Sequence, residues 1–253
     1  QARFISQILE RARQDNFRVN FFEAYDEPWK RRWEGTVGGY WGLFDGIERK
    51  LKYPAGVAIS NYPSWKLQMG GGLLLCISVF AVAWFMPKHR PSPPPLASWL
   101  AVAMSATSGG ILLGISVDKM LHESYGIGGW LVQGLLLVAA VTAPLLSTYA
   151  LMSGSTLPAF LEVLGPSKGL TPFFMANMLG ITLIVTTVIA VQTALSLIFD
   201  ARWRDFPFAA LTMAVVPFWT LAFSNGSKSG ERPLSEAVFA GLFALAAVYV
   251  VFN

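Results

Sequence analysis

The chain has 253 residues, of which 54% are hydrophobic and 13% are charged, and its formal net charge is +4. That charged fraction is about half of what an ordinary soluble domain carries, and residues 1–66 hold 19 of the 34 charged side chains. The distribution excludes a uniformly soluble protein, and so small a positive excess, lying mostly beside apolar runs, argues against nucleic-acid binding.

The first residues predict a helix followed by a strand. Ala2, Ile5 and Ile8 recur at helical spacing, so residues 1–16 predict an amphipathic helix. Residues 17–25 are apolar on both faces, which predicts a buried parallel strand. One helix–strand step cannot build a sheet, and about sixty residues are too few for an α/β core. We therefore expect this segment to be the last part of a larger domain.

Acidic and aromatic side chains follow the predicted strand. A period of two places Glu23, Tyr25 and Glu27 on one face. Carboxylates and flat rings at the carboxyl end of a strand suit sugar binding, because acids bind hydroxyl groups and rings cover pyranose faces. The alternative is an ordinary loop in which Glu27 or Glu34 forms a salt bridge with one of the basic residues 30–32. The glycines after Glu34 lack the spacing of a phosphate-binding loop.

Neither a metal site nor a disulfide is expected. Cys76 is the single cysteine, and it lies inside an apolar run. His89 and His122 lie between apolar runs, with no cluster of further ligand-type residues beside them. We expect no cofactor.

Six apolar stretches are long enough to cross roughly 30 Å of hydrocarbon. Charged residues, prolines and glycines separate them, and tryptophans lie near several of their ends. Residues 65–253 therefore predict a multi-pass transmembrane helix bundle, with the domain boundary after residue 64. The six predicted spans are Trp65–Met86, Leu96–Val117, Ile127–Met152, Pro172–Phe199, Phe206–Phe223 and Leu234–Phe252.

The charges between the spans favour an N-terminal segment outside the cytoplasmic membrane. In that orientation five Lys and Arg lie in inner loops and three lie in outer loops, where nearby acids offset them. No charged residue lies in the middle of a span, which argues against an ion-coupled transporter. We expect Gln133, Asn177 and Gln192 to form interhelical hydrogen bonds, and Gly110 with Gly114 to allow close helix packing.

The sequence also resembles a known family. Residues 22–30, Phe-Glu-Ala-Tyr-Asp-Glu-Pro-Trp-Lys, and residues 34–45, Glu-Gly-Thr-Val-Gly-Gly-Tyr-Trp-Gly-Leu-Phe-Asp, resemble the eighth strand and following loop of glycoside hydrolase family 17. The closer resemblance is to its bacterial membrane-bound branch, described as β-(1,3)/(1,6)-glucan synthases or transglucosylases. The loop 199–208 also resembles that branch. This implies a mainly α protein, in which about six spans follow the last αβ portion of a (β/α)8 barrel in residues 1–64.

The resemblance implies a retaining double displacement on β-linked glucan. Its general acid and nucleophile are glutamates that end the fourth and seventh strands, upstream of residue 1, so we expect this chain alone to be inactive. The accessory residues carried over are Glu27, Lys30 and Glu34. The implied substrate-binding residues are Glu23, Tyr25, Trp29, Tyr40 and Trp41. Lys30 is expected to hold the Glu27 carboxylate charged and in place near the cleft.

Three functions are compatible with these features. The first is a membrane-bound glycosidase or transglucosylase whose partners are a β-glucan and the lipid bilayer. The second is a subunit of a multi-pass transporter or channel, with residues 1–64 as an extramembrane cap. The third is a membrane anchor whose helices carry no chemistry.

Overall fold

A computed structural model describes residues 1–53, 60, 62–85, 94–155, 157, 163, 172–199 and 205–224, with residues 234, 237, 238, 241, 244 and 245. Within these residues the chain is mainly helical, and its only β pairing consists of isolated bridges. The chain divides into two compact units, which are described separately: residues 1–65 with 202–205, and residues 66–201 with 206–253.

The N-terminal unit begins with the predicted amphipathic helix. This helix, α1, covers Ala2–Asp15 and ends at Asn16, whose left-handed backbone lets the N–H of Phe17 donate to the Ala12 carbonyl at 3.1 Å. An exposed ion pair of 2.6 Å joins Arg11 and Asp15 on its surface. The Gln1 side chain donates to the carbonyl of Trp41 at 2.6 Å and thereby ties the start of the helix to a later loop. The helix prediction is confirmed.

The predicted strand over residues 17–25 does not form. The segment has no regular secondary structure apart from a single parallel bridge between Tyr25 and Phe44. Glu23 has φ 73°, a left-handed conformation that interrupts an extended run. A parallel strand needs a continuous partner, and here one residue is paired. The strand prediction is therefore wrong, and the residues that the structure describes do not show the αβ portion of a barrel.

Two short helices follow the bridge. They are a 3-10 turn, η1 (Pro28–Lys30), and α2 (Arg31–Gly38), which is interrupted at Gly35 by a φ of 67°. Beyond them, Gly42 lies so close to the backbone between Tyr25 and Asp26 that a Cβ there would overlap it. Glycine is needed at position 42 because the two backbone segments lie so close together, and no phosphate ligand is needed to explain it. Asp205 belongs to the same unit and accepts two hydrogen bonds from Thr36, at 3.0 Å and 2.6 Å.

The second unit contains four helices that are long and apolar enough to cross a membrane. They are α3 (Trp65–Phe85), α4 (Leu96–Glu123), α5 (Gly126–Ser153) and α7 (Pro172–Phe199), and they confirm four of the predicted spans. The fifth, α8 (Phe208–Ser224), is a 17-residue apolar helix of about 26 Å. The predicted span 234–252 lies largely outside the described residues.

One predicted loop is mostly helical. We expected a loop from Asp118 to Gly126, but α4 continues to Glu123. Pairs four residues apart stabilise this last turn: Lys119 contacts Glu123, and His122 lies 3.5 Å from Asp118. Charged residues indicate where a helix leaves the hydrocarbon layer of the membrane. The helix can continue beyond that point, as α4 does to Glu123.

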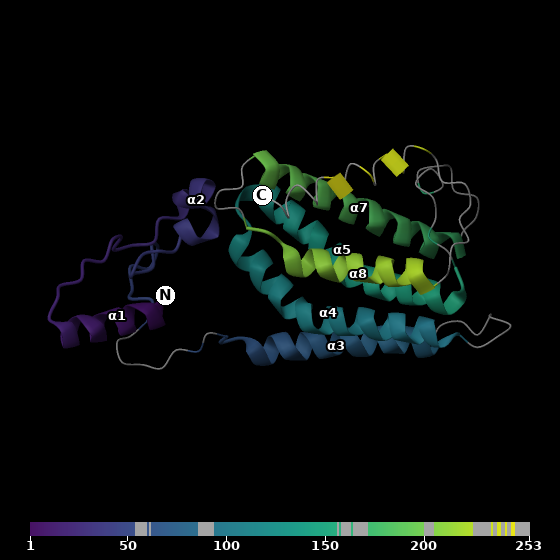
Figure 1. The fold of residues 1–253 in the computed structure, drawn as a ribbon, viewed down its shortest axis with the longest axis horizontal. Helices are drawn as coiled ribbons and strands as arrows, with labels where there is room; N and C mark the ends of the chain where they lie inside the picture. The colour runs from purple at the N-terminus through teal and green to yellow at the C-terminus, as the bar shows by residue number, and fades with distance from the viewer. Residues whose placement is uncertain are drawn as a thin grey trace. The chain divides into compact units, whose positions relative to one another are not determined.

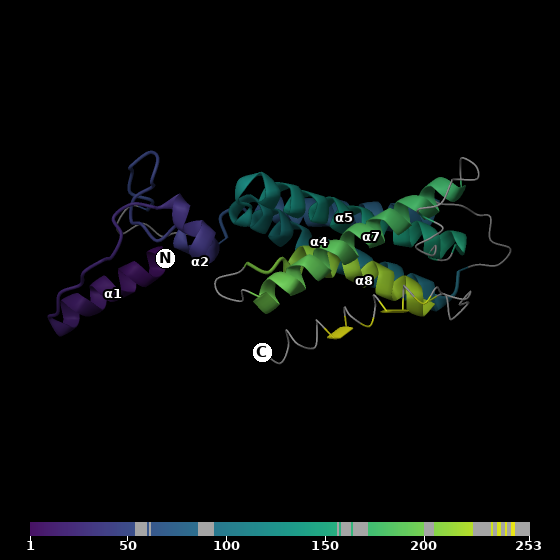
Figure 2. The ribbon, with the colours of Figure 1, turned by 90° about the horizontal axis from the view of Figure 1, so that it is seen from above.

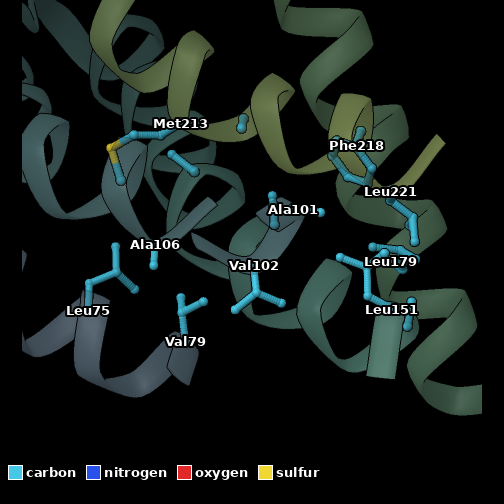
Figure 3. Close-up of a cluster of buried hydrophobic side chains, with 14 of the residues drawn as sticks. Leu75, Val79, Ala101, Val102, Ala106, Leu151, Leu179, Met213, Phe218 and Leu221 are labelled. Atoms are coloured by element: carbon cyan, nitrogen blue, oxygen red, sulfur yellow. The ribbon is translucent and has the colours of Figure 1, made fainter. Parts of the chain in front are cut away.

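Figures 1 and 2 show how these helices pack. Helices α4, α5 and α8 contact one another extensively, α7 packs on α5 and more sparingly on α8, and α3 and α7 lie on opposite sides of the bundle (Figure 1). Their shared core consists of aliphatic side chains together with Met152 of α5 and Met213 and Phe218 of α8. In Figure 3, Val79 of α3 faces Val102 of α4 within this core.

Small residues allow α3 to approach α4. A Cβ at Gly72 would overlap the Gly110 carbonyl oxygen, and a Cβ at Gly114 would overlap the Gln68 side chain. This confirms the close packing predicted for Gly110 and Gly114. Gly70, by contrast, has nothing within 4 Å of its Cβ direction, so it has no such role in the contact.

Hydroxyl groups provide the polar contacts between α4 and α8. Ser105 lies 3.3 Å from Thr220, and Ser98 lies 3.2 Å from Ser224. We had expected the three side-chain amides of Gln133, Asn177 and Gln192 to form such bonds. In the part of the chain that the structure describes these amides form no hydrogen bond, and the shorter Ser and Thr side chains make the polar contacts there.

Candidate functional site

Three charged side chains of the N-terminal unit meet at one point, which we call the Lys30 cluster: Glu23, Glu27 and Lys30. The Lys30 ammonium contacts Glu23 Oε1 and lies 2.7 Å from Glu27 Oε2. The 3-10 turn that begins after Glu27 brings Lys30 back over that carboxylate, three residues away. The backbone of Glu23 is left-handed, and from this conformation its carboxylate contacts the same Lys30 ammonium.

The cluster is partly shielded from solvent. The exposed fractions of the side chains are 7% for Glu23, 16% for Lys30 and 40% for Glu27. The hydrogen bond to Glu23, followed by the one to Glu27, raises the pKa of Lys30, so the ammonium form is stabilised. Glu23 Oε2 is buried and accepts no hydrogen bond within the described parts of the chain. The cluster therefore contains a buried carboxylate oxygen that has no hydrogen-bond donor among the described residues.

The predicted aromatic residues lie around the unit in different settings. The Trp29 ring is 59% exposed, and the Lys30 ammonium lies 5.6 Å from its centroid. Tyr25 instead packs against Phe44, with the ring centroids 5.6 Å apart. Tyr40 contacts the Arg31 guanidinium, and Trp41 is 44% exposed. Of these rings, the structure brings Trp29 to the Lys30 cluster.

Glu34 does not join Lys30. It lies in α2, where its side chain packs beneath Gly38. Of the predicted accessory residues, Glu27 and Lys30 are in contact. The second carboxylate on Lys30 is that of Glu23, which was predicted as a substrate-binding residue. The Glu27–Lys30 pair alone would also suit the simpler salt-bridged loop. The structure adds the Glu23 carboxylate and the exposed Trp29 ring to that pair.

A second ion pair was not expected from the sequence. Lys52 lies 2.8 Å from Asp26, whose side chain is 4% exposed, and also donates to the Tyr40 carbonyl at 2.9 Å. Nothing in the sequence identified Lys52 as the partner of Asp26, because the two residues lie far apart along the chain.

The chain was compared with protein-family models, curated proteins and solved structures. The chain matches no protein-family model, no curated protein and no solved structure.

Proposed function

We propose that the N-terminal unit belongs to a membrane-bound, β-glucan-active enzyme, a retaining glycosidase or transglucosylase, and that the apolar helices anchor it. The observation that carries the proposal is the Lys30 cluster, in which one ammonium holds two carboxylates beside the exposed Trp29 ring. The family resemblance of residues 22–45 supplies the substrate class. It assigns the general acid and the nucleophile to residues outside this sequence.

The chemistry of the cluster suits a sugar ligand. Carboxylate oxygens accept strong hydrogen bonds from sugar hydroxyls. Glu27, whose side chain is 40% exposed, is the carboxylate that a sugar hydroxyl can reach, and its contact with Lys30 fixes its orientation. The apolar face of Trp29 offers a surface on which a pyranose can stack. These groups would position a glucose unit, while the bond-breaking residues act elsewhere.

The apolar surface of the N-terminal unit supports its assignment to a larger domain. Within residues 1–53, Ala12 is the one apolar side chain that is buried outright. Phe4 is 66% exposed, and Phe22 and Ile47 are each 87% exposed. Further protein packed over these side chains would remove their apolar surface from water. Further barrel elements would cover it.

We place this enzyme in the cytoplasmic membrane with residues 1–64 on the outer side. The excess of Lys and Arg in the alternate loops between spans supports this orientation. A β-glucan emerging from the cell would then reach the site directly. Labelling of single cysteines in the loops with a membrane-impermeant reagent tests the orientation.

The substitution Glu27→Gln tests the site in the full-length gene product. Loss of the charge weakens the contact with Lys30 and displaces the positioned sugar, so turnover on β-1,3-glucan oligosaccharides should fall, by up to about 100-fold. Glu48→Gln is the matched control, because that side chain is 65% exposed and its ion-pair partner is Lys50, which lies outside the Lys30 cluster. Unchanged turnover in a folded Glu27→Gln protein would remove Glu27 from the site.

A further inference from the structure

Helix α7 has two distinct faces. One face is buried against its neighbours and includes Leu179, Thr182, Thr186 and Ile189. The exposed apolar residues recur at intervals of seven on the other face. These residues are Phe174, Ile181, Val188 and Leu195.

Near the end of α7 a second row joins this exposed face. Gln192 lies four residues after Val188 and three before Leu195, and Phe199 lies four residues after Leu195; both are exposed. Val185, seven residues before Gln192, packs against the core, so the second row begins at Gln192. Alternating steps of three and four residues form the seam along which two helices pair in a left-handed coiled coil. Because α7 packs on α5 and α8 through its opposite face, the seam lies on the outside of the described bundle (Figure 1).

Gln192 is the polar position of this seam. It lies about 10 Å before the end of the helix, inside the length that spans hydrocarbon. Its amide forms no hydrogen bond with any residue that the structure describes, although the side chain is exposed. Neighbouring hydroxyls can bond to their own helix, as Thr193 does to the Ile189 carbonyl at 2.8 Å. A carboxamide has two N–H donors and an acceptor, so it requires a polar partner in lipid.

We propose that α7 forms a parallel pair with α7 of a second copy of this chain, with the two Gln192 amides hydrogen-bonded across the pair. Copies inserted in one membrane share an orientation, so a twofold axis along the membrane normal places each seam residue opposite itself. A carboxamide both donates and accepts, which makes Gln192 complementary to its own copy. The exposed face of α3 around Leu73 and Leu74 is apolar, so lipid alone suffices there.

Disulfide cross-linking in lipid vesicles tests the seam in the full chain. In a Cys76→Ala background, single cysteines at Val188 or Leu195 should form disulfide-linked dimers on mild oxidation. Cysteines at Leu74 on α3 or Val138 on α5 are the matched controls, since those side chains are 69% and 61% exposed. Gln192→Leu should weaken dimerisation about 3- to 30-fold, and Gln192→Asn should retain most of it.

Three outcomes would overturn the proposal. The first is equal cross-linking of the control positions, which indicates random collision. The second is a monomer at every protein-to-lipid ratio. The third is a disulfide formed within one chain between cysteines at Val188 and Val238, which shows that the chain's own C-terminal segment covers this face.

Discussion

The protonation of Lys30 depends on two carboxylates at once. Glu23 stabilises the ammonium most strongly and Glu27 next, and both contacts raise the pKa of Lys30 above its ordinary value. For a lysine with a raised pKa, the stabilisation is complete below the unfolded-state pKa of about 10.4. It is lost as the pH rises through the higher pKa of the folded state. The cluster should therefore remain intact at neutral pH.

Amine acylation provides a direct measurement of this effect. At pH 8 an acylating reagent attacks the neutral amine, so Lys30 should react more slowly than Lys50, whose side chain is 79% exposed. Glu23→Gln should accelerate the labelling of Lys30, because the strongest cause of its raised pKa is removed. Mass spectrometry of the labelled peptides gives both rates. Equal rates for the two lysines would show that the cluster is open in solution.

Part of the Lys30 cluster could be predicted from residue spacing. Glu27 and Lys30 are three residues apart, and a single turn brings such residues together. Glu23 was expected on the face of Glu27 through strand periodicity. Its side chain does reach the cluster, but because the backbone of Glu23 is left-handed and not because a strand forms. A glutamate in the sequence does not indicate a left-handed backbone. The Asp26–Lys52 pair joins residues 26 positions apart, so it depends on the fold of the intervening loop.

At the scale of elements, the helices were predictable and the strand was not. A run of about twenty apolar residues can satisfy its backbone in lipid only as a helix, so composition alone identifies α3, α4, α5 and α7. A strand needs other segments as hydrogen-bond partners for its backbone. Within residues 17–25 only Tyr25 forms a bridge among the described residues, and its partner is Phe44. The end of α4 was misplaced because its terminal charges pair along the helix.

Alanine substitutions at two glycines of α3 should have opposite effects on the stability of the bundle. Gly72→Ala should destabilise the bundle by about 1–3 kcal/mol, because the added methyl meets the Gly110 carbonyl and separates α3 from α4. Gly70→Ala meets open space and should be neutral or stabilising by up to about 1 kcal/mol, since alanine favours the helix. Denaturant unfolding in mixed micelles measures both. A loss of stability for Gly70→Ala as large as that for Gly72→Ala would contradict the contact.

At the scale of the whole molecule, the two units have different kinds of stability. The bundle of α4, α5 and α8 has a continuous apolar core and hydroxyl contacts between its helices. The N-terminal unit has little buried apolar surface and relies on ion pairs and backbone hydrogen bonds. This contrast suits a helical membrane anchor joined to the terminal portion of a larger catalytic domain.

The most direct test of this account compares the full-length gene product with the 253-residue chain on β-1,3-glucan oligosaccharides, followed by linkage analysis of the products. The account predicts that the full-length protein converts the oligosaccharides with retention of anomeric configuration, and that the 253-residue chain leaves them unchanged. Conversion by the shorter chain, or no conversion by the full-length protein, would contradict it.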